Sequence, residues 1–145
     1  MKGVNRMFLN QVSVFLENSE GRLGSALIAL KNEGIDIKAL SLADTNDYGM
    51  LRMIVNDPEG ALSALKTSGF SAHLTKVIAV KLANRVGALA DLLKVISGEG
   101  FNIEYMYDLS SKDDSACMVI KVSDGEACAR FLSEKGLGVL SESDI

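Results

Sequence analysis

The chain repeats itself, and this internal duplication constrains its fold more than any other feature of the sequence. A shift of 66 positions aligns the first part of each repeat, and one extra residue in a later loop changes the shift to 67. The matches fall on apolar, glycine and acidic positions that set local structure, so coincidence explains them poorly. The aligned pairs include Val14 with Val80, Leu16 with Leu82, Asn18 with Asn84, Gly21 with Gly87, Leu27 with Leu93, Gly34 with Gly100, Asp57 with Asp124 and Gly69 with Gly136. The sequence therefore predicts two copies of one unit.

Each repeat begins with the same pattern. Apolar and polar residues alternate from Gln11 to Leu16, which is typical of a strand with one buried face, and Ile78 to Leu82 repeats the alternation. An apolar stripe with helical spacing follows in both repeats, and we expect Gly34 and Gly100 to end these helices in a left-handed conformation. The stripe consists of Leu23, Ala26, Leu27 and Leu30 in the first repeat and of Leu89, Leu92, Leu93 and Ile96 in the second.

The second part of each repeat predicts a strand, a turn, a strand, a short helix and a final strand. The expected segments are second strands at 35–43 and 101–109, third strands with Leu51, Met53 and Val55 or Met118, Ile120 and Val122, helices that begin near Pro58 and Gly125, and fourth strands at 70–75 and 137–140. The order βαββαβ, found twice, predicts an α+β protein with antiparallel sheets that carry helices on one face. We place the domains at residues 1–76 and 77–145.

Composition excludes several functional classes. The 145 residues are 48% hydrophobic and 23% charged, as in a soluble globular protein, and the net charge is −4. The basic residues are scattered, so we expect no nucleic-acid binding, and no apolar run is long enough to span a membrane. Cys117 and Cys128 lack a CxxC spacing, which favours a reduced, cytoplasmic protein. We expect neither a cofactor nor a metal ion.

The turn between the first strand and first helix of each repeat carries the chemistry of a binding site. It reads Asn18-Ser19-Glu20-Gly21-Arg22-Leu23 in the first repeat and Asn84-Arg85-Val86-Gly87-Ala88-Leu89 in the second. Glycine lets the backbone approach a ligand closely, and the first N–H groups of a helix attract a carboxylate. The asparagine oxygen could accept a hydrogen bond from an ammonium group. The alternative is that Asn18 and Asn84 only cap the helices.

A second matched pair strengthens the binding hypothesis. Asp36 in Gly34-Ile35-Asp36-Ile37 and Asn102 in Gly100-Phe101-Asn102-Ile103 stand at the start of the second strand. The pattern NxxGxL, a helix and then G-[IF]-[DN]-I resembles the ACT domain, an amino-acid-binding regulatory module, over nearly the whole chain. For Asp36 the alternative reading is a solvated acid at the start of a strand.

The resemblance implies two ferredoxin-like units in tandem that form one eight-stranded antiparallel sheet, with each ligand between the first loop of one unit and the second strand of the other. It implies two ligand sites in one chain. One site would use Asn18, Glu20, Gly21 and Arg22 with Asn102 opposite, and the other would use Asn84, Val86, Gly87 and Ala88 with Asp36 opposite. The family commonly has proline before the loop glycine, where this chain has Glu20 or Val86. Because Glu20 brings a negative charge near an incoming carboxylate, the second loop is the better candidate.

The expected function is therefore that of a non-catalytic sensor that binds a free amino acid, forms a homodimer and acts on a separate metabolic enzyme. An alternative is a regulatory subunit, similar to the small subunit of acetohydroxyacid synthase, whose essential property is contact with its partner protein. A third reading is an enzyme with the same fold, such as an acylphosphatase, for which Arg85 is the one candidate. His73, the single histidine, has no nucleophile in a recognisable motif beside it.

Overall fold

The computed structural model describes residues 4–44, 47–113 and 115–145. Thr45, Asn46 and Asp114, which belong to the turns predicted between the second and third strands, lie outside the described residues. By internal contacts the chain divides into two compact units. The first unit is Asn10–Thr75, and the second unit consists of Met1–Leu9 and Lys76–Ile145. The predicted division at residues 76 and 77 describes the repeats in the sequence and stays a prediction.

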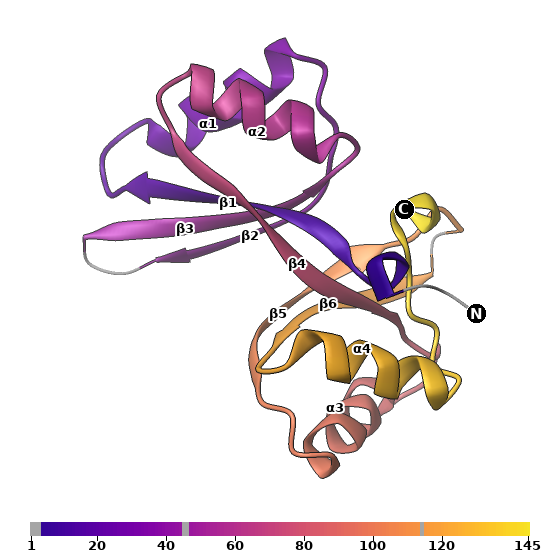
Figure 1. The fold of residues 1–145 in the computed structure, drawn as a ribbon. Coiled ribbons are helices and arrows are strands. Elements are labelled where there is room, and N and C mark those ends of the chain that lie inside the picture. Colours follow the sequence, from indigo (N-terminus) through magenta and orange to yellow (C-terminus); the bar gives the residue numbers. More distant parts are fainter. Residues whose placement is uncertain (1–3, 45–46, 114) are drawn as a thin grey trace. The chain divides into compact units, whose positions relative to one another are not determined.

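The first unit contains a sheet with two helices on one face (Figure 1). Its hydrogen-bonded neighbours follow the order β2-β3-β1-β4, and the pairs β1–β3 and β2–β3 are antiparallel. The elements are β1 (Leu9–Glu17), α1 (Arg22–Asn32), β2 (Ile37–Asp44), β3 (Tyr48–Val55), α2 (Pro58–Thr67) and the beginning of β4 (Ser71–Lys81).

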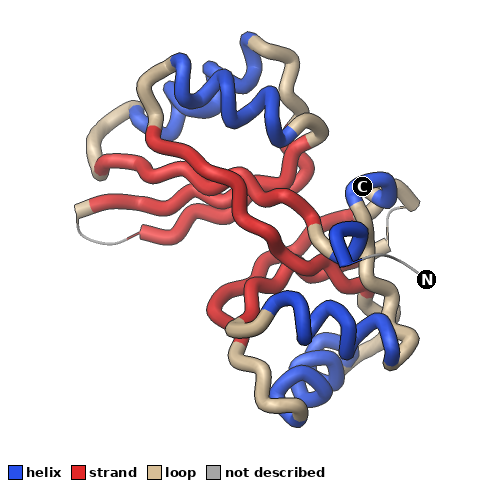
Figure 2. Tube along the Cα trace, in the orientation of Figure 1, coloured by secondary structure: helices blue, strands red, loops and turns tan. Residues whose placement is uncertain are grey.

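The second unit repeats this arrangement with the remainder of β4. Its strands follow the order β4-β6-β5, and α3 and α4 cover one face of this sheet (Figure 2). The elements are the 3-10 helix η1 (Val4–Met7), α3 (Ala88–Gly98), β5 (Ile103–Ser110), β6 (Ala116–Val122), α4 (Gly125–Glu134) and the 3-10 helix η2 (Glu142–Asp144).

The described residues form six strands, so the expectation of eight strands is wrong in number. The fourth strand of the first repeat and the first strand of the second are one continuous strand, β4, because no glycine or proline interrupts the chain between Phe70 and Leu82. The final predicted strand, at 137–140, is reduced to a single bridge between Val80 and Val139. Glycine weakens strands, and Gly136 and Gly138 flank Leu137.

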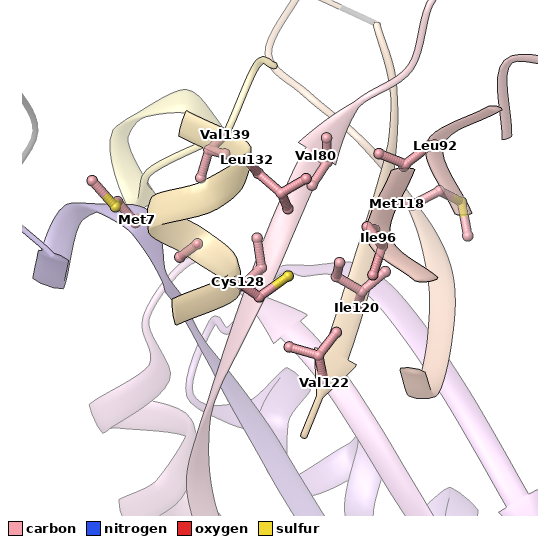
Figure 3. Packing of buried hydrophobic residues seen from close by; sticks show 12 residues of the cluster. Met7, Val80, Leu92, Ile96, Met118, Ile120, Val122, Cys128, Leu132 and Val139 are labelled. Atoms are coloured by element: carbon pink, nitrogen blue, oxygen red, sulfur yellow. The ribbon is translucent and has the colours of Figure 1, made fainter. Parts of the chain in front are cut away.

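Each unit has its own apolar core, built from the residues that the periodicities predict. In the first unit Val12, Val14 and Leu16 of β1 pack with the buried side of α1 and with Leu51, Met53 and Val55 of β3. The second core contains the corresponding residues of β4, α3 and β6, with one addition from outside the repeat. Met7, in η1, is only 6% exposed and packs into this core with Ile78, Val80, Leu92, Ile96, Met118, Ile120, Val122, Cys128, Leu132 and Val139 (Figure 3).

Local chemistry fixes the helix ends as expected. Gly34 and Gly100 follow α1 and α3 with φ of 69° and 85°, which confirms their predicted left-handed conformation. Asp57 and Asp124 cap α2 and α4, because their carboxylates accept hydrogen bonds from the N–H groups of Gly60 and Ala127. The described residues contain no helix that is long and apolar enough to cross a membrane.

Candidate functional site

A glycine directly precedes the first helix of each unit. Gly21 is the N-cap of α1 with φ of 82°, and Gly87 is the N-cap of α3 with φ of 85°, so the N-cap residue itself offers no side-chain hydrogen bond at either helix. The N-cap residues are thus Gly21 and Gly87, and the alternative in which Asn84 caps its helix is wrong. The N–H of Ala88 bonds to the carbonyl of Arg85. The next N–H groups of a first helical turn have no partner within the helix and point outward.

An open pocket of about 960 Å³ lies at the start of α3, within the second unit. Its lining includes all four residues predicted from the second loop, and it adds residues from the β5–β6 segment. The lining consists of Leu82, Ala83, Asn84, Arg85, Val86, Gly87, Ala88, Leu89, Ala90, Asp113, Ser115 and Ala116. We call this cavity the Gly87 pocket. The sequence thus predicted one wall of the pocket, while ligand binding in it stays a prediction.

Charge in the second loop is already paired. The guanidinium of Arg85 binds the carboxylate of Asp91, in the first turn of α3, with an N–O distance of 2.7 Å. Val86 is fully exposed at the loop tip. The pairing of Arg85 reduces its ability to bind a phosphate group, so the geometry gives the phosphatase reading little support.

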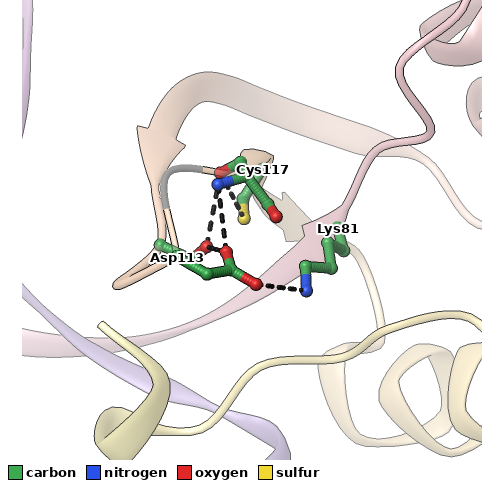
Figure 4. Close-up of polar contacts among 5 residues, drawn as sticks. Lys81, Asp113 and Cys117 are labelled. Atoms are coloured by element: carbon green, nitrogen blue, oxygen red, sulfur yellow. Dashed lines mark hydrogen bonds and ion pairs between the residues drawn. The ribbon is translucent and has the colours of Figure 1, made fainter.

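The lining of the Gly87 pocket also includes a carboxylate, that of Asp113, which the sequence did not single out. Asp113 Oδ1 accepts hydrogen bonds from the hydroxyl of Ser111 and from the N–H of Ser115, and Oδ2 binds Lys81 Nζ at 3.0 Å (Figure 4). These donors lower the pKa of Asp113 and keep the carboxylate ionised, with Ser111 as the largest cause. Serine two positions before and after an aspartate was the available sequence signal, but such a pattern is common in turns.

The predicted residues of the first loop make separate local contacts, in contrast to those of the second loop, which line one pocket. The guanidinium of Arg22 lies over the ring of Phe70, 4.3 Å from its centre, and its Nε is buried without a hydrogen-bond partner in the described structure. Glu20 is exposed, and the N–H of Asn18 binds the carbonyl of Asp47 at 3.2 Å. The cation–π contact directs the charge of Arg22 toward the end of α2.

Asp36 and Asn102 occupy equivalent positions immediately before β2 and β5. Each exchanges two hydrogen bonds with the residue that directly follows the next strand in the chain, β3 or β6. Asp36 pairs with Asn56, and Asn102 pairs with Ser123, at distances of 2.9 to 3.2 Å. The carboxylate of Asp36 also binds Lys38 Nζ at 3.1 Å. Both positions are exposed and held in fixed backbone geometry.

Within one unit, the loop and the strand-start residue lie at opposite ends of a helix. Gly21 precedes α1 and Asp36 follows it, and the same holds for Gly87, α3 and Asn102. An 11-residue helix is about 16 Å long, so no single unit brings both groups to one small ligand. The pairing of a loop with the strand-start residue of the other unit stays a prediction.

The comparisons with known proteins place the chain in a family. The family described as "ACT domain pair" matches residues 7–145. The chain belongs to the ACT domain pair family. Protein BT0572 from Bacteroides thetaiotaomicron has a similar structure with a TM-score of 0.89 and 41% sequence identity, over 97% of this chain and 96% of that one. No curated protein matches the sequence.

More distant structures share the fold of this ACT domain pair. The regulatory subunit of aspartate kinase from Thermus thermophilus gives a TM-score of 0.59 with 19% identity, over 86% of this chain and 90% of that one. The corresponding subunit from Thermus flavus gives a TM-score of 0.54 with 20% identity, over 87% of this chain and 92% of that one.

In the part of the chain that the structure describes, no group of three acidic, histidine or cysteine side chains is placed to hold a metal ion.

Proposed function

We propose that this ACT domain pair is a non-catalytic sensor that binds a free amino acid in the Gly87 pocket. The observation that carries the proposal is the position of an uncapped helix start at the wall of a pocket large enough for a small molecule. The matched glycine, Gly21, has the same left-handed conformation in the other unit. Family membership supports the amino-acid ligand by resemblance.

The carboxylate of the ligand would bind the exposed N–H groups at the start of α3. The helix dipole favours a negative charge there by about 0.3–1 kcal/mol, and more where the site is partly buried. Asn84 lines the same pocket and can accept a hydrogen bond from the ammonium group. Val86 and Ala88 present small apolar surfaces to the ligand side chain.

The wider arrangement that we propose includes a second site and a partner. Asp36 would complete the Gly87 site from the other unit or from a second copy, and Asn102 would complete the site at Asn18, Glu20, Gly21 and Arg22. Ligand binding would change the activity of a separate enzyme chain. For this to occur the ligand must bind two states of the assembly with different affinities, and such coupling is typically about 1–3 kcal/mol.

The direct test is isothermal titration calorimetry of the full chain with each of the twenty amino acids. We expect at least one amino acid to bind, and we expect Gly87→Ala to weaken that binding about tenfold or more. Alanine at this φ costs roughly 1–2 kcal/mol. The strain falls on the backbone of a residue that lines the pocket, so we expect it to displace the N–H groups at the start of α3.

Gly136→Ala provides a matched control. Gly136 has φ of 75°, also has no atom within 4 Å of an added Cβ, and lies outside the Gly87 pocket. Its substitution introduces similar backbone strain in the same unit, so it should lower stability without changing the dissociation constant. Equal affinity in Gly87→Ala and the wild type would contradict the placement of the site, and the absence of binding by every amino acid would contradict the function.

A further inference from the structure

We propose that Asp113 is the residue of the Gly87 pocket that receives the ammonium group of the ligand, and that Lys81 competes with the ligand for it. This inference rests on the proposed function, because it names a specificity-determining residue for that same pocket. Asp113 comes from the β5–β6 segment and belongs to neither motif that the sequence predicted. It lines the pocket together with Ser115 and Ala116.

Strand pairing brings Asp113 to the pocket. Lys81, at the end of β4, pairs with Cys117 of β6, and the N–H of Leu82 binds the carbonyl of Ala116 at 2.9 Å. The β5–β6 segment therefore lies beside the loop that continues from β4 to Gly87. The carboxylate and the start of α3 consequently border the same cavity. A zwitterion needs one group that binds its anion and one that binds its cation, and the lining of this pocket contains both.

The carboxylate is fixed in place and retains acceptor capacity. Oδ1 is occupied by the hydroxyl of Ser111 and the N–H of Ser115. Oδ2 accepts a hydrogen bond from Lys81 Nζ, and a carboxylate oxygen has two lone pairs. The side chain of Asp113 is 60% exposed, so an ammonium group can reach it from the pocket. A charged acceptor binds ammonium more strongly than the neutral amide oxygen of Asn84 does.

The pair of Lys81 and Asp113 distinguishes the two units. Under the shift of 66 positions Lys81 aligns with Phe15, whose ring stacks on Tyr48 with 4.9 Å between ring centres. An aromatic pair thus stands in the first unit where the second unit has a lysine paired with a carboxylate. Among the described residues, the pair of a lysine and a carboxylate beside the pocket belongs to the second unit.

The two members of the ion pair should affect the ligand in opposite directions. Removing the carboxylate removes the acceptor, so Asp113→Asn should weaken binding of the amino acid about tenfold or more. Removing the lysine removes a competing cation, so Lys81→Met should bind the amino acid as tightly as the wild type or more tightly. If the pair only held the loop in position, both substitutions would weaken binding alike.

The experiment compares an amino acid that binds in the calorimetric screen with the 2-hydroxy acid that has the same side chain. Both ligands carry the carboxylate, and only the amino acid carries the ammonium. We measure both dissociation constants for the wild type, Asp113→Asn, Lys81→Met and the control Glu126→Gln. Glu126 forms an ion pair with Arg130 on α4, and its side chain is 61% exposed against 60% for Asp113, so this control removes the same charge outside the pocket.

We expect the preference for the amino acid over the hydroxy acid to fall about tenfold in Asp113→Asn and to stay unchanged in Glu126→Gln. An unchanged preference in Asp113→Asn, with wild-type binding present and weakened by Gly87→Ala, would overturn the role of Asp113 and leave the proposed function intact. Equal losses in Asp113→Asn and Lys81→Met would also overturn it. Failure of every amino acid to bind the wild type would overturn both proposals.

Discussion

Gly87 and Asp113 both line the pocket, but only Gly87 could be predicted as a site residue from the sequence. Gly87 could be found because a glycine at the start of a helix, repeated as Gly21, has a local physical reason. Asp113 could not be found in this way, because its environment depends on Lys81 from another strand as well as on its neighbours Ser111 and Ser115. The conformation of a helix start depends on residues adjacent in the sequence. The residues that line a pocket also depend on which strands pair and in which register.

The lowered pKa of Asp113 predicts a pH dependence of stability. Because the folded-state pKa lies below the ordinary value near 4, ionised Asp113 favours the folded state at neutral pH. This contribution should decline as the pH falls below about 4, the ordinary carboxyl range. Urea unfolding at pH 7 and pH 3 should show the wild type more stable than Asp113→Asn at pH 7, with a smaller difference at pH 3. The same difference at both values would contradict the assignment.

The buried thiols predict low reactivity. Burial raises the pKa of Cys128 to about 11 and also raises the pKa of Cys117. Only thiolates react readily, so native protein at pH 8 should be labelled slowly by a thiol reagent and should gain two labels in urea. The raised pKa of Cys128 further predicts that stability falls as the pH rises from about 8.5, the ordinary thiol value, toward 11. Rapid labelling of the native protein would contradict this prediction.

At the scale of elements, periodicity and end signals located the four α-helices found in the described residues and most of the strands. The errors concern where strands begin and end, because this depends on whether a glycine or proline interrupts the chain. Residues 70–75 and 78–82 were read as two strands, yet the absence of a breaker lets β4 run through Ser71–Lys81. Conversely, Gly138 comes so close to Lys81 that an added Cβ would lie 3.0 Å from its Cβ, and only one bridge forms there. Hydrophobicity alone does not distinguish these outcomes.

The caps of α2 and α4 give a prediction at this scale. Asp57→Ala and Asp124→Ala should each lower the free energy of unfolding by about 1 kcal/mol, because each removes a hydrogen bond to an N–H group of the first turn. Asp57→Asn and Asp124→Asn keep a capping oxygen and should lose less. Urea denaturation of the four variants measures the differences. Asparagine variants as unstable as the alanine variants would show that charge, and not the cap, is responsible.

At the scale of the whole molecule, the repeat predicted two units with separate cores, and both cores are present. The prediction of a first domain at 1–76 placed residues 4–9 with the first repeat by their order in the chain alone, whereas the structure groups them with the second unit. Residues before the first strand precede the first repeat in sequence, but η1 contributes Met7 to the core of the second unit. Nothing in the periodicity of 4–9 specifies which unit receives this segment, since its packing depends on a surface formed by α4 and the end of the chain.

Met7 therefore provides a test of how the chain is divided. Met7→Ala should destabilise the second unit by about 2–4 kcal/mol, because a nearly buried side chain leaves a cavity. Hydrogen exchange followed by mass spectrometry should show faster exchange in α4 and β6. Met53→Ala, which removes a fully buried methionine of the first core, is the matched substitution and should act on β1 and β3. Faster exchange from Met7→Ala confined to residues 10–75 would contradict the division.

The central claim is that the start of α3 binds the carboxylate of an amino acid, and an NMR titration of backbone amides tests it most directly. Adding an amino acid identified by calorimetry should produce saturable shifts of the amide signals of Gly87, Ala88, Leu89 and Ala90, and these shifts should be lost in Gly87→Ala but kept in Gly136→Ala. Saturable shifts confined to other parts of the chain, such as the cavity between α1 and α2 beside Gly60 and Ser63, would contradict it.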